Sequence, residues 1–153
     1  MDQPGEPRRP YALQPGQGWT YRFGIDFTLK TGEIQAGSGA AVLEYGSSPG
    51  DEPPDHTHAT EDELFYVLEG ALTFRCGGQS FELEPGGFIF LPRGLEHGYS
   101  IRTSARVRLL AITYPAHAGA AGGWGGFVAD LETRQGELIA RPPFAAGSAG
   151  SSA

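Results

Sequence analysis

Short segments in which apolar and polar residues alternate recur along most of this chain. Residues 19–23, Trp-Thr-Tyr-Arg-Phe, carry a large apolar side chain at every second position. The same alternation occurs over residues 106–113, where two arginines alternate with Val107 and Leu109. A period of two residues is the pattern of a β-strand with one buried face. The hydrophobic pattern therefore predicts β-strands rather than helices.

Further short apolar segments, bounded by glycine, proline or acidic residues, predict additional strands. Such segments occur at 40–45, 63–69, 88–91 and 99–103. Two more alternating segments, with Leu72 and Phe74 in the first and Phe81 and Leu83 in the second, meet around Gly77-Gly78 and indicate a β-hairpin. A chain of about nine or ten short strands with frequent turn residues is typical of an all-β domain.

Composition separates the two ends of the chain from this strand-rich region. Residues 1–18 are rich in Pro, Gly, Gln and Arg, and we expect a flexible N-terminal arm there, followed by one β domain over 19–115. Residues 116–144 begin as a Gly/Ala-rich segment in which 127–134 predicts a short helix. The Ala/Gly/Ser-rich residues 145–153 predict a disordered tail.

Size and charge limit the classes of function. A chain of 153 residues with 39% hydrophobic and 19% charged residues predicts one globular domain. Its 18 acidic and 11 basic residues give a net charge of −7, and the basic residues form no visible cluster. A nucleic-acid-binding or anionic-membrane-binding protein would carry such a cluster, so neither partner is expected.

The cysteine count and the hydrophobic segments indicate the compartment. A single cysteine, Cys76, excludes an internal disulfide. The first residues lack the basic and apolar segments of a secretory signal, and no apolar stretch reaches the length of a membrane-spanning helix. We therefore expect a cytoplasmic protein.

Three of the four histidines lie in two glycine-bounded frames together with one acidic residue. His56 and His58 are one residue apart, so both point to the same face if the backbone is extended, and Glu63 follows five residues later. His97 lies in the second frame, after Pro92-Arg93-Gly94. Neutral imidazole and carboxylate are ligands that divalent first-row metals accept. An isolated His-x-His would be read as two surface histidines, but the added Glu and His favour a metal role.

These residues carry a resemblance to the cupin family. The first cupin motif is matched at Gly50, His56, His58, Glu63 and Gly70, and the second is matched at four signature positions, which are Gly86, Pro92, Gly94 and His97. The second motif departs from the family at its last position, where Ile101 replaces the usual Asn. Fifteen residues, 71–85, separate the frames, which is typical of small microbial members. The resemblance implies an antiparallel jelly-roll β-barrel with a metal inside.

The resemblance also implies which residues bind the metal. It assigns His56, His58, Glu63 and His97 as ligands of one divalent transition metal, which could be Fe, Mn, Ni, Cu, Co or Zn. The family permits a shift of one residue after the second His, so Asp62 is an alternative to Glu63. The six-residue run from Glu63 to Gly70 favours Glu63, and we expect Glu61 and Asp62 to be solvated acids.

Alternation along the expected strands suggests a substrate pocket beside the metal. Counting from Glu63 puts Phe65 and Val67 on the inner face, and Tyr99 shares the face of His97. The turn before His97 interrupts the alternation, so Phe88 and Phe90 are assigned to the pocket by a weaker argument. Most of these aromatic residues also suit a hydrophobic core.

Cupins of this size and ligand set resemble the flavonol (quercetin) dioxygenase group, which implies a dioxygenase acting on a small enolic or aromatic compound. In that case Glu63 would be both a ligand and the general base. The alternatives are a metal-dependent isomerase, cyclase or decarboxylase, and a barrel that binds a small molecule without turnover, because a fold does not settle a function. A homodimer is also expected, since Trp19, Tyr21 and Phe23 would leave an apolar edge to cover.

Overall fold

A computed structural model of the chain describes residues 8–116, 127 and 136–144. These residues form ten strands and one short helix, so the all-β prediction is confirmed. The elements are β1 (Trp19–Phe23), β2 (Ile25–Thr31), α1 (Glu33–Ala36), β3 (Ala41–Ser47), β4 (Asp62–Glu69), β5 (Leu72–Cys76), β6 (Gln79–Leu83), β7 (Phe88–Leu91), β8 (His97–Ile101), β9 (Val107–Tyr114) and β10 (Glu137–Ala140).

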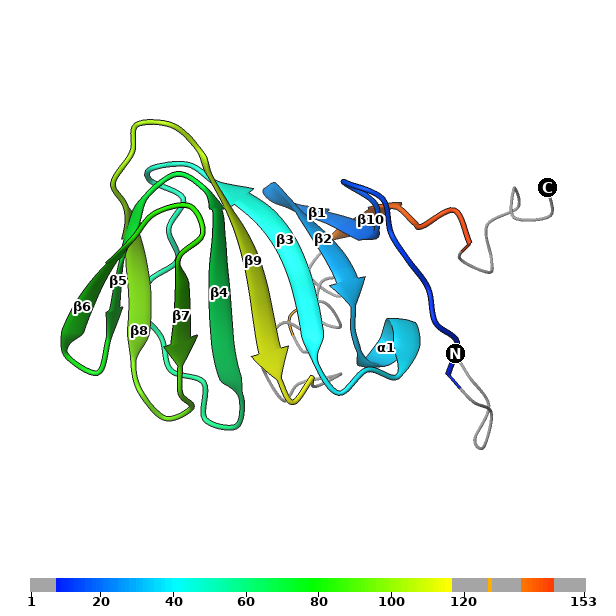
Figure 1. The fold of residues 1–153 in the computed structure, drawn as a ribbon, viewed down its shortest axis with the longest axis horizontal. Helices are drawn as coiled ribbons and strands as arrows, with labels where there is room; N and C mark the ends of the chain where they lie inside the picture. Colours follow the sequence, from blue (N-terminus) through cyan, green and yellow to red (C-terminus); the bar gives the residue numbers. More distant parts are fainter. Residues whose placement is uncertain (1–7, 117–126, 128–135, 145–153) are drawn as a thin grey trace.

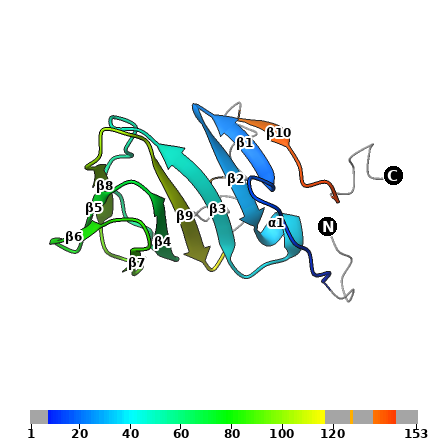
Figure 2. The same ribbon diagram turned by 45° about the horizontal axis from the view of Figure 1, so that its top comes forward.

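The strands form two antiparallel sheets (Figure 1). The larger sheet has seven strands in the order β10-β1-β2-β3-β9-β4-β7, and the smaller sheet has three in the order β6-β5-β8. The smaller sheet lies beside β7 and β4, at the end of the molecule opposite β1 and β10 (Figures 1 and 2). Non-consecutive neighbours such as β3-β9 and β9-β4 bring distant parts of the sequence together in one sheet.

The inner faces of the two sheets pack against each other and form the core. Phe65 of β4 contacts Phe74 of β5, with ring centroids 5.3 Å apart, and Phe74 contacts Tyr99 of β8 at 5.4 Å. Strands β4 and β9 alternate between buried and more exposed residues, as expected when one face of a sheet is covered. The side chains at the inner positions of β4 and β8 therefore meet across the core.

Glycines with positive φ angles turn the chain between the core strands. Gly77 and Gly78, at φ 58° and 80°, connect β5 and β6, so the predicted hairpin is confirmed. Gly70 ends β4 at φ 84°, and a Cβ atom there would lie 2.5 Å from the Val107 side chain. Only glycine fits this turn without displacing β9.

Strands β2 and β10 were not predicted from the sequence, and the helix predicted at 127–134 lies almost entirely outside the described residues. Strand β2 was not predicted, although Ile25, Phe27 and Leu29 alternate with polar residues as in the other strands. Strand β10 pairs with β1 and has only four residues, too few for a clear periodic signal. The predicted helix at 127–134 lies outside the described residues except for Phe127, and so does the predicted tail. In the part of the chain that is described, no helical segment has the length and hydrophobicity needed to cross a bilayer.

Candidate metal centre

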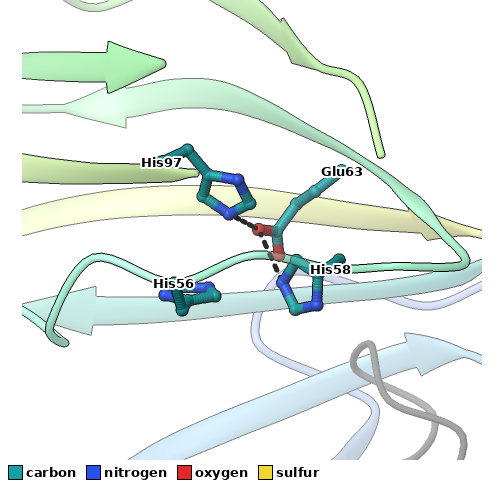
Figure 3. A group of neighbouring side chains, drawn as sticks. All are labelled: His56, His58, Glu63 and His97. Carbon is teal, nitrogen blue, oxygen red and sulfur yellow. Dashed lines mark hydrogen bonds and ion pairs between the residues drawn. The ribbon is translucent and has the colours of Figure 1, made fainter. Parts of the chain in front are cut away.

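The four predicted ligands come together from two strands and one loop (Figure 3). Glu63 is the second residue of β4, and His97 is the first residue of β8. His56 and His58 lie on the loop between β3 and β4. This loop is fastened to β8 by two backbone hydrogen bonds, because the amide of His56 donates to the carbonyl oxygen of His97 and the amide of His97 donates to that of His56. The donor–acceptor distances are 2.9 and 2.8 Å.

The side chains of these residues converge on one point. Each offers one ligand atom, and the four atoms all lie within 4.8 Å of one another. Nε2 of His97 is 3.0 Å from Oε1 of Glu63, and Nε2 of His58 is 3.5 Å from the same oxygen. Glu63 and His97 are buried, whereas His56 and His58 are partly exposed. One carboxylate thus lies among three imidazole rings.

Hydrogen bonds on the far side of two rings fix their tautomers. Nδ1 of His56 donates to the carbonyl oxygen of Pro54 at 2.9 Å, because a carbonyl oxygen can only accept. Nδ1 of His58 lies 2.8 Å from the carboxylate of Glu61 and donates to it in the same way. When neutral, both rings therefore have their unprotonated nitrogen, Nε2, on the side of the centre, as ligand histidines do when their other nitrogen is held by a carbonyl or carboxylate.

Glu61 was expected to be a solvated acid, and that prediction is wrong. Its side chain is only 1% exposed. One oxygen accepts the hydrogen bond from His58, and the other accepts one from the hydroxyl of Thr60 at 2.7 Å. A buried carboxylate must be paired, and the adjacent histidine provides the partner. Glu61 thereby orients a predicted ligand.

The alternative assignment of Asp62 as a ligand disagrees with its position. Asp62 is on the opposite side of β4 from Glu63, where its carboxylate accepts hydrogen bonds from the backbone amide of Arg93 at 3.0 Å and from the Arg93 side chain at 3.1 Å. These interactions lower the pKa of Asp62. Glu63 is therefore the acid of this strand that faces the three histidines.

Charge interactions inside the cluster shift two pKa values. The Glu63 carboxylate, helped by the charge of Glu61, raises the pKa of His58 against the opposing effect of burial. Burial acts to raise the pKa of Glu63, but interactions with His58 and His97 outweigh it and lower that pKa. The cluster thus favours an ionised carboxylate beside the imidazole rings.

The cluster fits a divalent transition metal. Nε2 of His58 is buried and has no hydrogen-bond partner, although a buried polar nitrogen ordinarily has one. Three imidazole nitrogens and one carboxylate oxygen are a donor set that such metals accept, and the four atoms are close enough to share one ion. Four protein ligands leave positions open on a five- or six-coordinate ion, and open positions distinguish catalytic from structural sites.

A cavity of about 280 Å³ opens beside this cluster. Besides the four residues of the cluster, its walls are formed by Ile25, Phe27, Tyr45, Ser47, Asp51, Pro53, Phe65, Phe74, Gly98, Tyr99 and Phe127. Most of this lining is aromatic or aliphatic. The volume is near the lower limit for small-molecule sites, which suits a compact ligand.

The structure separates the five residues that were predicted to line the pocket. Phe65 and Tyr99 line the cavity. Val67 is fully buried in the core and does not reach it. Phe88 and Phe90 are 53% and 51% exposed and do not line it either, so the pocket assignment is wrong for Val67, Phe88 and Phe90.

The register of β7 explains the position of its phenylalanines. Leu91 pairs with Glu63, which faces the core, and directly opposite residues in antiparallel strands share a face. Phe90 pairs with Leu64 instead, and Phe88 pairs with the exposed Tyr66. Ile89 and Leu91, rather than the two phenylalanines, therefore point inward.

Three hydroxyl groups in the cavity wall were only partly anticipated. Tyr45 and Tyr99 contact each other through their hydroxyl oxygens at 3.1 Å, and Ser47 lies on the same face of β3 as Tyr45. Burial, followed by the neighbouring Tyr99, raises the pKa of Tyr45 well above its ordinary value, and burial raises that of Tyr99. The alternation in β3 predicts that Tyr45 faces inward, but nothing in the sequence alone indicates that β3 meets β8.

Comparison with known proteins shows which family the chain resembles in the region that contains this site. Residues 45–113 match the model of the cupin domain. The chain is 31% identical over 107 residues to quercetin 2,3-dioxygenase of Bacillus subtilis. The aligned region covers 69% of this chain and 32% of that protein. It is also 30% identical over 63 residues to the tetracenomycin polyketide synthase protein TcmJ of Streptomyces glaucescens. That aligned region covers 41% of this chain and 42% of TcmJ. The chain thus spans less than half of the length of either relative.

Solved structures agree with the fold. A predicted oxalate decarboxylase from Thermotoga maritima superposes with a TM-score of 0.60 and 16% identity, covering 69% of this chain and 99% of that one. An RmlC-like cupin from Shewanella frigidimarina superposes with a TM-score of 0.58 and 18% identity, covering 72% of this chain and 95% of that one. At these identities the superpositions bear on the fold alone.

Proposed function

The chain belongs to the cupin superfamily, and on that premise we propose that it is a metal-dependent dioxygenase that acts on a small enolic or aromatic compound. The observation that carries this proposal is the convergence of three imidazoles and one carboxylate at the wall of an aromatic cavity. The likeness to a quercetin 2,3-dioxygenase supports the choice of substrate class. We also propose that the two sheets close into the jelly-roll barrel that the cupin resemblance implies.

In this proposal His56, His58, Glu63 and His97 hold one divalent transition metal. The metal would supply a Lewis acid that lowers the pKa of a bound substrate hydroxyl and an exchangeable position for a second oxygen ligand. The protein would contribute the orientation of the rings, through Pro54 and Glu61, and an apolar environment that limits access of water. An apolar environment strengthens the charge interactions inside it.

Glu63 would also accept the proton of the substrate hydroxyl. Its carboxylate is buried and faces the cavity, and its lowered pKa keeps it in the ionised form that can accept a proton. A positioned base of this kind contributes roughly a hundredfold or more to a reaction rate. Phe65, Phe74 and Phe27 would hold the planar part of the substrate, because aromatic rings pack favourably at offset or edge-to-face geometries.

Oxygen uptake tests the proposal directly. Protein reconstituted separately with Fe, Mn, Co, Ni or Cu is mixed with a panel of flavonols and related enolic aromatics, and dissolved O₂ is followed with an electrode. We expect at least one metal and substrate pair to consume O₂, and the His58→Ala, His97→Ala double variant to consume none above the free-metal background. No uptake with any pair would contradict the dioxygenase proposal.

A second candidate is a metal-dependent isomerase, cyclase or decarboxylase that needs no O₂. It is favoured by the likeness to a polyketide synthase protein and by the hydroxyl groups of Tyr45 and Tyr99, which share the cavity with Glu63. A base and hydrogen-bond donors around one cavity suit proton transfer and enolate stabilisation. Turnover of an enolic substrate under argon would favour this candidate over the dioxygenase. Metal-dependent ligand binding without turnover in either atmosphere would favour a binding protein.

A further inference from the structure

The cavity beside the candidate metal centre contains a second polar site that the proposed dioxygenase chemistry does not use. Tyr45 and Ser47 are two residues apart on β3, so both side chains point to the inner face of the large sheet. Tyr99 reaches the same place from β8 in the small sheet, and its hydroxyl lies 3.1 Å from that of Tyr45. All three residues line the cavity. We call these three residues the hydroxyl cluster.

One member of the hydroxyl cluster lacks a hydrogen-bond partner in the protein. The Ser47 residue is 2% exposed, and its Oγ atom is buried with no partner. A buried hydroxyl in this state loses its hydration without compensation unless a ligand or a water molecule pairs with it. Apart from the Tyr99 hydroxyl, with which Ser47 interacts, the cavity wall includes the apolar side chains of Phe27, Phe65 and Phe74. The oxygen is therefore placed to bind a polar atom of whatever fills the cavity.

The residues of the hydroxyl cluster belong to the buried part of the cavity wall. Other lining residues lie nearer the surface, since Asp51 and Pro53 are exposed and Ile25 and Phe127 are partly exposed. Tyr45, Ser47 and Tyr99 are 6%, 2% and 4% exposed. A ligand that reaches these three residues and the metal centre together is held at two polar points, with apolar contacts between them.

We propose that the hydroxyl cluster is a second anchor for the substrate, which binds an oxygen substituent distinct from the one that binds the metal. This inference rests on the proposed function and narrows its substrate class. The substrate is a compact planar aromatic compound with an enol or α-hydroxyketone at one end and a further phenolic hydroxyl or carbonyl oxygen elsewhere on the ring system. Ser47 and the tyrosine pair are then specificity-determining residues, because leaving the buried Ser47 hydroxyl unpaired disfavours analogues that lack the second oxygen.

Anaerobic binding measurements test this anchor apart from turnover. Ni-reconstituted protein is titrated with 3-hydroxyflavone and with its derivatives that carry one additional hydroxyl at position 2′, 3′ or 4′ of the phenyl ring, and the absorbance of the flavonol is followed. We expect at least one derivative to bind about tenfold more tightly than 3-hydroxyflavone, which is the effect of one net hydrogen bond. In Ser47→Ala and in Tyr99→Phe this affinity ratio should fall to about one.

Tyr66→Phe is the matched control, because it also removes a tyrosine hydroxyl, but from the exposed outer face of β4. This variant should keep the tenfold ratio. Detectable binding of 3-hydroxyflavone to each variant shows that the fold and the metal centre are intact. A ratio of about one in the unmodified protein, or a tenfold ratio that survives in both Ser47→Ala and Tyr99→Phe, overturns the second anchor but leaves the proposed function standing. Failure of 3-hydroxyflavone itself to bind overturns the substrate class of the proposed function, and the anchor with it.

Discussion

Two adjacent acidic residues, Glu61 and Asp62, have opposite surroundings although their side chains carry the same charge. Glu61 is buried and accepts a hydrogen bond from Nδ1 of His58, whereas Asp62 pairs with the exposed Arg93 on the other side of the strand. Composition and spacing do not distinguish them, since the difference depends on where the chain enters β4. Residue types and motif spacing therefore indicate the four clustered residues but not the acid that pairs with His58.

A Glu61→Ala substitution should weaken metal binding without removing a ligand. The substitution leaves Nδ1 of His58 without its acceptor, and loss of such a supporting hydrogen bond typically lowers metal affinity by roughly ten- to a hundredfold. Affinity is measured by competition with a chromophoric chelator. Asp62→Ala is the control and should change the affinity by less than about twofold. Equal affinity in the two variants would show that Glu61 does not support the centre.

A Glu63→Gln substitution should separate the two roles proposed for this residue. Glutamine keeps the size and one oxygen donor of glutamate, but it cannot accept a proton as a carboxylate does. We expect substantial metal content with a loss of turnover of roughly a hundredfold or more. Metal content and rate are measured on the same preparation. Undiminished turnover would remove Glu63 as the base.

At the scale of secondary-structure elements, the alternation of residues predicts most strands, and the pairing of strands decides which faces are buried. The sequence contains Phe-Ile-Phe-Leu at β7 with no indication of which pair points inward. The pairing of Leu91 with Glu63 settles this and turns the larger phenylalanines outward. Counting from Glu63 places Phe65 in the cavity wall, but Val67, from the same count, lies in the core without lining the cavity. Phe88 and Phe90, where the count crossed a turn, face outward.

The register of β7 predicts an unusual order of stability for two neighbouring substitutions. Leu91 is 1% exposed and lies in the core, whereas Phe90 is 51% exposed. Leu91→Ala should therefore lower the free energy of unfolding by about 2–5 kcal/mol, while Phe90→Ala, although it removes a larger side chain, should cost less than about 1 kcal/mol. Urea denaturation of the two variants measures both values. A larger loss for Phe90→Ala would contradict this register.

At the scale of the whole molecule, a homodimer stays a prediction. Tyr21 is buried within the chain, but Phe23 is 41% exposed, and Tyr66, Phe88 and Phe90 add further exposed aromatic side chains on another face. Exposed apolar area of this kind is commonly covered in an assembly. Sedimentation equilibrium at micromolar concentration should give twice the chain mass of 16.2 kDa. A single-chain mass would rule the dimer out.

The all-β fold class could be predicted because alternation, which identifies strands such as β4 and β9, is a short-range pattern. The spacing of His56, His58 and Glu63 is also local, whereas His97 was grouped with them through the resemblance to the cupin motifs. The hydroxyl cluster and the role of Glu61 could not be predicted in the same way. They depend on which sheet faces which, and on the path of the loop between β3 and β4.

Metal analysis of the folded protein shows whether His56, His58, Glu63 and His97 bind one metal ion, on which the proposed function depends. The unmodified protein and the His58→Ala, His97→Ala double variant are dialysed against Ni²⁺ or Zn²⁺, freed of unbound ion and measured for metal per chain by mass spectrometry. Thermal unfolding is recorded on the same samples. We expect close to one ion per chain in the unmodified protein, and a melting temperature that rises with metal because the ion binds only the folded state. The double variant should show neither property. Full occupancy in a folded double variant would contradict it.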